Sequence, residues 1–194
     1  LLISGGHTEI VEIENWGKYK ILGTTRDDAV GEAFDKVARL LGLPYPGGPE
    51  ISRLAEIARE THIPHTAQLP RPMIHSHDFD FSFSGLKTSV LYYIRYHGTL
   101  SETKKMDLAL NPPTGGSGDP KQDFVLDLAR EFEDAVVEVL LKKTKQALLE
   151  TGAQTLIIAG GVIANKKIRE TFMELPKELS GLDVKIPTHV MATD

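Results

Sequence analysis

The stretch Leu1-Leu2-Ile3-Ser4-Gly5-Gly6-His7-Thr8-Glu9 decides the fold, because it runs an apolar strand directly into a Gly-Gly turn. The pattern returns near the other end, in Thr155-Leu156-Ile157-Ile158-Ala159-Gly160-Gly161-Val162. Glycines just past a buried strand let a ligand lie against the backbone, and their N–H groups suit phosphate. Two such turns on one sheet predict a nucleotide held between them.

Around the two turns, the sequence predicts a β-hairpin, then several helices, then a β-α-β unit. The turn signal Asn15-Trp16-Gly17-Lys18 separates two strands of the hairpin. The strands expected are 1–14, 19–25, 79–84, a buried strand 155–159, and 184–186. The helices expected from apolar spacing are 29–41, about 50–61 with Pro49 in its first turn, 85–96, 121–151 and 165–174. Loops are expected over 62–78 and over 98–120, the latter flexible.

Composition places the chain among ordinary globular proteins. It has 194 residues, of which 41% are hydrophobic and 25% charged, enough for one sizeable core. It has no cysteine, which excludes a disulfide framework and a thiolate nucleophile and fits a reducing cytosol. No apolar run approaches the ~20 residues of a membrane span, so no membrane contact is expected. The net charge of −5 argues mildly against nucleic-acid binding, unless a basic surface is local or supplied by a partner.

Three segments offer polar groups to a nucleotide, and each has a plain structural alternative. Asp35 follows Glu32 by three residues, so both reach one helix face, where they could accept ribose hydroxyls or simply be solvated. Pro46-Gly47-Gly48-Pro49 places free amides at a helix N-terminus, or is only a turn. Asn165 can cap the helix that follows it, or read an adenine or ribose edge.

Other polar segments are given structural interpretations. The segments His62-Ile63-Pro64-His65 and His75-Ser76-His77-Asp78 look like metal-ligand clusters, but neither lies on a predicted helix at ligand spacing. We interpret them as loop histidines. Asp27 and Asp28 are explained by the dipole of the helix that they precede. No Gly-x-Ser-x-Gly elbow is present for a serine nucleophile.

Five segments in one order resemble the TsaD family of bacterial tRNA N6-adenosine threonylcarbamoyltransferases, formerly called glycoproteases. They are Ser4-Gly5-Gly6-His7-Thr8, Asp27-Asp28-Ala29-Val30-Gly31-Glu32-Ala33-Phe34-Asp35-Lys36, Tyr45-Pro46-Gly47-Gly48-Pro49, Phe81-Ser82-Phe83-Ser84-Gly85-Leu86-Lys87-Thr88 and Ala159-Gly160-Gly161-Val162-Ile163-Ala164-Asn165. The resemblance covers the chain apart from 98–120, and five motifs in this order are not expected by chance.

The resemblance implies an α/β fold, namely one lobe of the actin/Hsp70/sugar-kinase (ASKHA) superfold with a mixed sheet flanked by helices. On this expectation, residues 1–194 form a single lobe of a two-lobed protein and are truncated at both ends. A helical insertion is expected over about 44–120, and it includes the flexible loop 98–120.

The family's chemistry is the transfer of a threonylcarbamoyl group from threonylcarbamoyl-AMP to N6 of adenosine 37 in tRNAs that read codons starting with A. The residues that match its substrate-binding positions are Leu2, Ile3, Ser4, Gly5, Gly6, Asp35 for the ribose, Gly48 and Asn165 for the adenosine. Some members carry an aspartate where this chain has Ser52, which puts that contact in doubt. His7 is a candidate for assisting proton transfer, with a hydrogen-bonded turn histidine as the alternative.

The resemblance also implies one divalent metal ion, iron or zinc. Two of its ligands are histidines of a His-x-x-x-His helix that would precede Leu1, and the third matches Asp194. We therefore expect the chain alone to be inactive. The implied partners are tRNA, threonylcarbamoyl-AMP and TsaB-like and TsaE-like proteins, and the implied location is the cytoplasm.

Three other functions compete with this one. A kinase or ATPase of the same superfold would need a second phosphate loop and a catalytic aspartate in the other lobe. A metalloprotease would need a zincin motif, which the chain lacks. A non-catalytic partner subunit of the same fold would have lost the adenylate residues, whereas Asp35, Gly48 and Asn165 are present.

Overall fold

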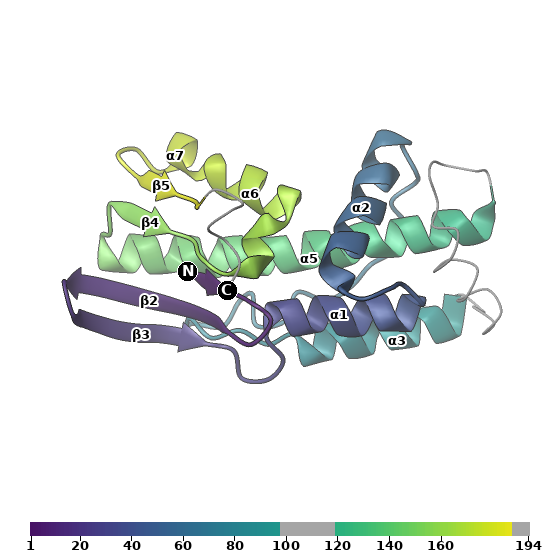
Figure 1. The fold of residues 1–194 in the computed structure, drawn as a ribbon, viewed down its shortest axis with the longest axis horizontal. Coiled ribbons are helices and arrows are strands. Elements are labelled where there is room, and N and C mark those ends of the chain that lie inside the picture. The colour runs from purple at the N-terminus through teal and green to yellow at the C-terminus, as the bar shows by residue number, and fades with distance from the viewer. Residues whose placement is uncertain (98–118, 188–194) are drawn as a thin grey trace. The chain divides into compact units, whose positions relative to one another are not determined.

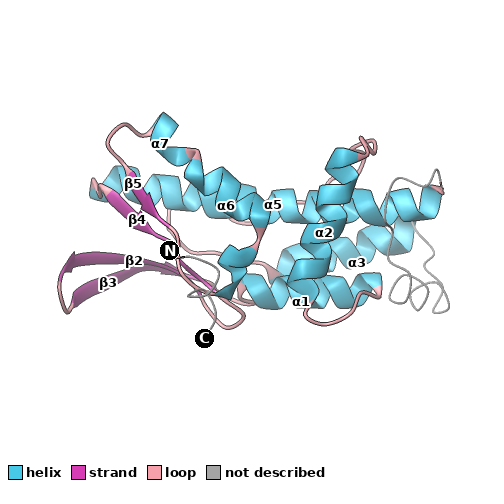
Figure 2. Cartoon of the chain, turned by 45° about the horizontal axis from the view of Figure 1, so that its top comes forward, coloured by secondary structure: helices cyan, strands magenta, loops and turns pink. Residues whose placement is uncertain are grey.

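The computed structural model describes residues 1–97 and 119–187 (Figure 1). Helices and strands both contribute, which confirms the α/β class (Figure 2). In chain order the elements are β1 (Leu2–Ile3), β2 (Thr8–Asn15), β3 (Lys18–Thr24), α1 (Val30–Leu41), α2 (Gly47–Glu60), α3 (Ser84–His97), α5 (Pro120–Thr151), β4 (Thr155–Ile157), the 3-10 helix η1 (Gly161–Ala164), α6 (Lys166–Met173), α7 (Leu175–Glu178) and β5 (Asp183–Lys185). No helix in these ranges is long and apolar enough to cross a membrane.

The chain divides into two compact units. Unit 1 consists of residues 1–32, 71–83 and 136–194, and unit 2 consists of residues 33–70 and 84–135. The predicted loop 98–120 lies almost entirely outside the described residues, and its last residue, Pro120, already begins α5.

Unit 1 is built on a mixed sheet. β1 pairs antiparallel with β2, β2 pairs antiparallel with β3, and β4 pairs parallel with β5. A parallel bridge from Leu2 to Ala159 joins the two groups, and Ile3 N–H donates to Ala159 O (2.8 Å). The spatial order is therefore β3-β2-β1-β4-β5. One face of this sheet is buried, and its residues are Ile3, Thr8, Ile10, Leu156 and Ile158.

One strand prediction in unit 1 is wrong, and a second is right in position but only partly right in burial. Residues 79–84 make only an isolated bridge, between Phe81 and Thr25, because Asp80 turns its carboxylate back onto Thr24 N–H (3.0 Å). The alternation in this segment reflects the burial of Phe81 and Phe83, not a strand. The predicted strand 155–159 forms as β4, and its expected burial holds for Leu156 and for Ile158 just after it, whereas Ile157 is 52% exposed. Its outward face is uncovered in the described chain.

Unit 2 is helical, and it includes the part of α5 up to residue 135. Phe34 of α1 and Phe132 of α5 pack edge to face, with ring centroids 5.1 Å apart. Other fully buried residues of this core are Ile51, Leu54, Leu86, Val90 and Leu128. The loop after α2 is tied to α5 by carboxylates: Asp127 accepts from the Thr66 and Ala67 N–H groups, both at 2.8 Å. α2 begins at Gly47, three residues before the predicted start.

Candidate functional site

The first Gly-Gly turn is closed by Ser4. Ser4 N–H donates to His7 O (2.8 Å), and Ser4 Oγ accepts from His7 N–H (3.0 Å) and from Gly6 N–H (3.3 Å). Gly5, Gly6 and His7 are exposed. The N–H of Gly5 has no partner within residues 1–97 and 119–187. The turn therefore presents one open backbone donor, beside a hydroxyl that fixes its shape.

The start of α1 is anchored on this turn. Val30 N–H donates to the hydroxyl of fully buried Thr8 (2.8 Å), and Gly31 N–H donates to Ser4 O (3.2 Å). A Cβ at Gly31 would lie 2.8 Å from Ser4 O and 2.9 Å from Gly5 Cα. Sequence reasoning missed Thr8 and Gly31. Gly31 could have been noticed, because glycine in the first turn of a predicted helix is less favourable than alanine and so indicates a packing requirement.

The second Gly-Gly turn packs directly on β1. Gly160 has φ +102°, and a Cβ there would lie 2.3 Å from Ile3 O. Because β1 and β4 are parallel neighbours, both turns follow the carboxyl ends of adjacent strands. The prediction of two Gly-Gly turns on one sheet is confirmed, with the turns next to each other in unit 1.

Asn165 follows the second turn and caps α6. Its Oδ1 accepts from Ile168 N–H (2.9 Å), and its own N–H donates to Val162 O (3.0 Å). The capping interpretation of Asn165 is confirmed. A contact with adenosine remains a prediction.

The glycines around the two turns differ in what the fold requires of them. Gly31 and Gly160 are required by packing, because a side chain would collide with the backbone of Ser4 or Ile3. At Gly5 and Gly6, a Cβ would meet no heavy atom of the described chain within 4 Å. Packing and backbone conformation therefore do not require glycine at Gly5 and Gly6, and these two positions leave the backbone of the turn accessible.

Unit 2 brings Asp35 and Gly48 together. Asp35 Oδ1 accepts from Gly47 N–H (2.7 Å). The amide of Gly47 is therefore bonded, although the sequence had suggested free amides in this segment. A Cβ at Gly47 would lie 2.4 Å from Ala38 Cβ, whereas one at Gly48 would make only ordinary contact, 3.9 Å from Phe34 Cβ. Asp35 thus positions the start of α2, and its second carboxylate oxygen has no hydrogen-bond partner in the described ranges.

The two histidine segments hold structural contacts. His65 Nε2 lies 2.8 Å from the buried carboxylate of Glu131 in unit 2. In the described ranges, no three His, Cys, Asp or Glu side chains gather as a metal site. The predicted metal ligand Asp194 lies outside the described residues.

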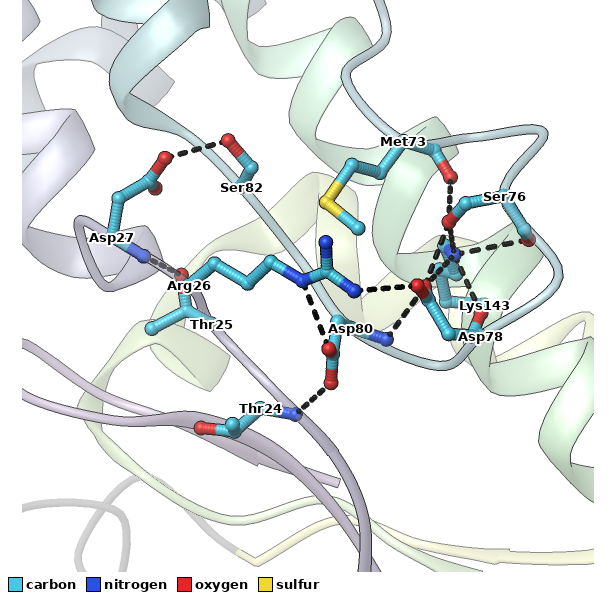
Figure 3. A network of polar contacts seen from close by, with 10 residues as sticks. All are labelled: Thr24, Thr25, Arg26, Asp27, Met73, Ser76, Asp78, Asp80, Ser82 and Lys143. Atoms are coloured by element: carbon cyan, nitrogen blue, oxygen red, sulfur yellow. Dashed lines mark hydrogen bonds and ion pairs between the residues drawn. The ribbon is translucent and has the colours of Figure 1, made fainter.

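A network of polar contacts in unit 1 holds residues 73–82 against the end of β3 (Figure 3). Arg26 donates to Asp80 Oδ2 (3.0 Å) and to Asp78 Oδ2 (2.7 Å). Lys143, with a fully buried side chain, donates to Ser76 Oγ and to Asp78 O, both at 2.6 Å. The pKa of Asp78 is lowered, mainly by the hydrogen bond from the Ser76 hydroxyl and further by Lys143. Residues 75–78, which looked like a metal-ligand cluster in the sequence, therefore provide hydrogen-bond acceptors for the buried ammonium group of Lys143.

Asp27 has a more specific role than the predicted one. Its carboxylate accepts from Phe83 N–H (2.8 Å) and from Ser82 Oγ (2.6 Å), the latter seen in Figure 3. The helix dipole alone therefore does not account for this aspartate, which ties residues 82–83 to the start of α1.

Comparisons with known proteins give one consistent result. The family model described as "TsaD: tRNA N6-adenosine threonylcarbamoyltransferase" matches residues 1–194. The chain is 48% identical to a tRNA N6-adenosine threonylcarbamoyltransferase of Neisseria meningitidis, over 97% of this chain and 46% of that protein. It is 48% identical to the one of Ralstonia pickettii, over 100% of this chain and 50% of that protein. The chain spans about half the length of the curated relatives it matches.

Proposed function

This chain belongs to the TsaD family of tRNA N6-adenosine threonylcarbamoyltransferases, and from that premise we propose that the whole protein makes threonylcarbamoyladenosine in tRNA. It would transfer the threonylcarbamoyl group of threonylcarbamoyl-AMP to N6 of adenosine 37 in tRNAs that read codons starting with A. The observation that carries this proposal is the family match over the whole chain. Nothing comparable favours a kinase or ATPase.

In unit 1, the proposed binding residues are Leu2, Ile3, Ser4, Gly5, Gly6 and Asn165. The exposed N–H of Gly5 is the group best suited to the phosphate of the adenylate, because a backbone donor in a fixed turn needs no reorganisation when negative charge grows on the leaving AMP. Ser4 contributes by fixing the turn through two hydrogen bonds. Asn165 would present its amide to the adenosine while still capping α6.

In unit 2, the proposed binding residues are Asp35 and Gly48. Oδ2 of Asp35 would accept from a ribose hydroxyl, and the bond from Gly47 N–H holds the carboxylate in place for this (2.7 Å). The amide of Gly48, in the first turn of α2, would add a second donor, because such amides have no partner inside their helix.

The reaction requires no covalent enzyme intermediate. The N6 amine attacks the carbamoyl carbon, the C–O bond to the phosphate breaks, and AMP leaves while the amine loses a proton. His7 remains a candidate for carrying that proton, since its side chain lies in an exposed turn beside Gly5 and Gly6. A His7→Ala variant with unchanged turnover would remove it from the mechanism.

The remaining features of the family are proposed on resemblance. A divalent iron or zinc ion, when bound, would polarise the carbamoyl group as a Lewis acid, and Asp194 is the ligand that this chain would provide. The superfold is proposed to be of the ASKHA type. Residues 1–194 would be one lobe, with a helical insertion over about 44–120. The proposed partners are tRNA and TsaB-like and TsaE-like proteins, and the proposed location is the cytoplasm.

The direct test uses the whole protein with synthetic threonylcarbamoyl-AMP, unmodified tRNA and the partner proteins. Modified adenosine is measured by mass spectrometry of tRNA digests. We expect modification that depends on the enzyme and on the adenylate. Absence of modified adenosine, with the same partners active alongside a known transferase of the family, would refute the proposal.

A further inference from the structure

The exposed side of α3 carries two tyrosines and an arginine near the end of the helix. These residues are Tyr92, Arg95 and Tyr96, and we call them the tyrosine stripe. Because residues three and four positions apart are neighbours on a helix surface, the three side chains lie on one side of α3. The buried residues of the helix lie on the opposite side, and they are Leu86, Val90 and Ile94.

Polar contacts within the protein do not explain the tyrosine stripe. Tyr92 is 51% exposed and Tyr96 is 81% exposed, and Arg95 is exposed as well. None of the three side chains has a hydrogen-bond, ion-pair or ring partner within residues 1–97 and 119–187. Exposed helix positions favour residues such as alanine, glutamate and lysine, and tyrosine is a weaker helix former. The local rules of helix formation therefore give no reason for two tyrosines here.

Tyr93 shows what a tyrosine of this helix does when it packs inside the unit. Its ring stacks with that of Phe124 in α5, with centroids 5.8 Å apart, and lies 4.5 Å from the ring of His97. Tyr92 and Tyr96 have no such ring contact in the described part of the chain. Their aromatic faces are therefore open to a ligand.

The charge of α3 differs from that of the chain as a whole. The chain has a net charge of −5, whereas residues 84–97 contain Lys87 and Arg95 and no aspartate or glutamate. Every other helix of at least eight residues in the described ranges contains a carboxylate. The helix dipole favours a cation in the last turn, where Arg95 lies, but it does not call for tyrosines beside it. A polyanion would thus reach the tyrosine stripe without repulsion from carboxylates of the same helix.

We infer that the tyrosine stripe binds the anticodon loop of the tRNA, an inference that rests on the proposed function. Adenosine 37 lies beside the anticodon in a single-stranded loop. Proteins bind such RNA by stacking unpaired bases on aromatic side chains and on arginine guanidinium groups.

On this inference, the rings of Tyr92 and Tyr96 stack on bases of the loop, and Arg95 contacts the RNA backbone. The stripe belongs to the same unit as Asp35 and Gly48, the proposed adenylate contacts. The lack of carboxylates on α3 favours this polyanion over a protein partner, whose surface carries charges of both signs. A local surface of this kind also reconciles an acidic chain with a nucleic-acid substrate.

The test measures binding of an anticodon stem-loop RNA to the whole protein with its partner proteins, by fluorescence anisotropy. Tyr96→Leu removes the aromatic face but keeps an apolar side chain that suits a helix, whereas Tyr96→Phe keeps the ring. Tyr92→Leu and Tyr92→Phe repeat this comparison. Arg95→Gln removes the cation. Its matched control is Arg39→Gln, because Arg39 is exposed in the last turn of α1 in the same unit.

We expect the dissociation constant for the stem-loop to rise at least ~5-fold in each Leu variant and to stay near the wild-type value in each Phe variant, as base stacking requires. Arg95→Gln should reduce the slope of log affinity against log salt by about 0.7, the value for one phosphate contact on a single strand, and Arg39→Gln should leave that slope unchanged. Circular dichroism shows whether each variant is folded, and the second tyrosine serves if one variant is not.

Two results would overturn the inference. The first is that both Leu variants bind the stem-loop as tightly as a wild-type protein that does modify tRNA. The second is that the Leu variants lose affinity for the partner proteins and not for the RNA, because the stripe would then bind protein. Stem-loop binding that depends on the stripe, in a wild-type protein that makes no modified adenosine, would support the inference and refute only the proposed function.

Discussion

Glycines that look alike in the sequence do different things in the structure. Gly160 adopts φ +102° against the carbonyl of Ile3, whereas Gly5 and Gly6 face open space without left-handed geometry. The first kind is needed for folding. The fold does not require glycine at positions of the second kind. The close approach of the proposed ligand would require it. This distinction allows stability and activity to be separated by substitution.

Gly160→Ala is expected to destabilise the protein. The substitution places a side chain in the left-handed region and 2.3 Å from Ile3 O. Backbone strain and overpacking each cost of the order of 1–3 kcal/mol, so we expect a loss of about 3 kcal/mol in the free energy of unfolding. Urea denaturation measures this. The control is Gly85→Ala, where a Cβ meets no described atom within 4 Å. An equally stable Gly160→Ala protein would contradict the packing shown here.

Gly5→Ala is expected to leave folding intact and to weaken transfer. The added methyl meets nothing in the described chain, so the free energy of unfolding should change by less than about 1 kcal/mol. The same methyl would stand where the adenylate approaches the backbone, and we expect kcat/KM for threonylcarbamoyl-AMP to fall at least ~10-fold, an energy of about 1.4 kcal/mol. Unchanged kcat/KM would show that the turn does not contact the substrate.

At the scale of elements, the start of α1 depends on a residue from another element. The hydroxyl of Thr8 in β2 accepts from Val30 N–H, as a capping residue normally does from within the helix (2.8 Å). Thr8 is fully buried, so this hydrogen bond is shielded from bulk solvent. The hairpin and residues 30–32 at the start of α1 are therefore joined by hydrogen bonds around the first turn.

Thr8→Val tests this bond while preserving shape. We expect a loss of about 1–2 kcal/mol in the free energy of unfolding, since a helix N–H is left buried without an acceptor. Thr155→Val, at an exposed position of β4, is the control and should change stability by less than about 0.5 kcal/mol. Equal denaturation midpoints for the two variants would show that the Val30 N–H finds another acceptor.

The attachment of the loop at Thr66 and Ala67 to α5 should be sensitive to acid. Burial acts to raise the pKa of Asp127, but hydrogen bonds from Ala67, Thr66 and Arg130 outweigh it, and the pKa lies below its ordinary value. A lowered pKa in the folded state gives stability that is present above the unfolded pKa of about 3.9 and is lost as the pH falls through the folded pKa.

Asp127→Asn should therefore lower the free energy of unfolding at pH 7 by about 1.5–3 kcal/mol, the range for hydrogen bonds to a charged group. The difference from wild type should shrink as the pH falls below about 4. Urea denaturation at a series of pH values measures it. A difference that stays constant down to pH 2 would show that the charge of Asp127 is not what holds the loop.

The sequence predicted well what depends on local pattern. Helix 29–41, the hairpin and the long helix after 120 follow from apolar spacing and turn residues, and the structure has them. Partners distant in sequence were not predictable. The alternation at 79–84 reflects Phe81 and Phe83 entering the core, and α2 begins early because Asp35 lies at its N-terminus. A carboxylate's hydrogen-bond partner depends on which segments meet, and residue spacing does not contain that information.

For the whole molecule, we expect residues 1–194 alone to produce no modified adenosine, whereas the whole protein does. The chain spans about half the length of its relatives, and two of the three metal ligands that the family resemblance implies are histidines that would precede Leu1. The measurement is the mass-spectrometric assay above with equal amounts of the two proteins. Modification by the shorter chain at a comparable rate would show that this half carries the complete catalytic machinery.

The position of β1 has a consequence for how the chain reaches its native state. β1 is the middle strand of its sheet, yet one of its two neighbours, β4, lies more than 150 residues later, as the bond from Leu1 to Ile157 shows (separation 156). During synthesis, the hairpin emerges from the ribosome with β1 as a bare edge, and it keeps that edge until β4 is translated. Closing the sheet then pays the entropy of a very long loop, so its assembly is a late and slow step. In the cell, the interval before that step is when the nascent chain is most open to chaperones and to aggregation.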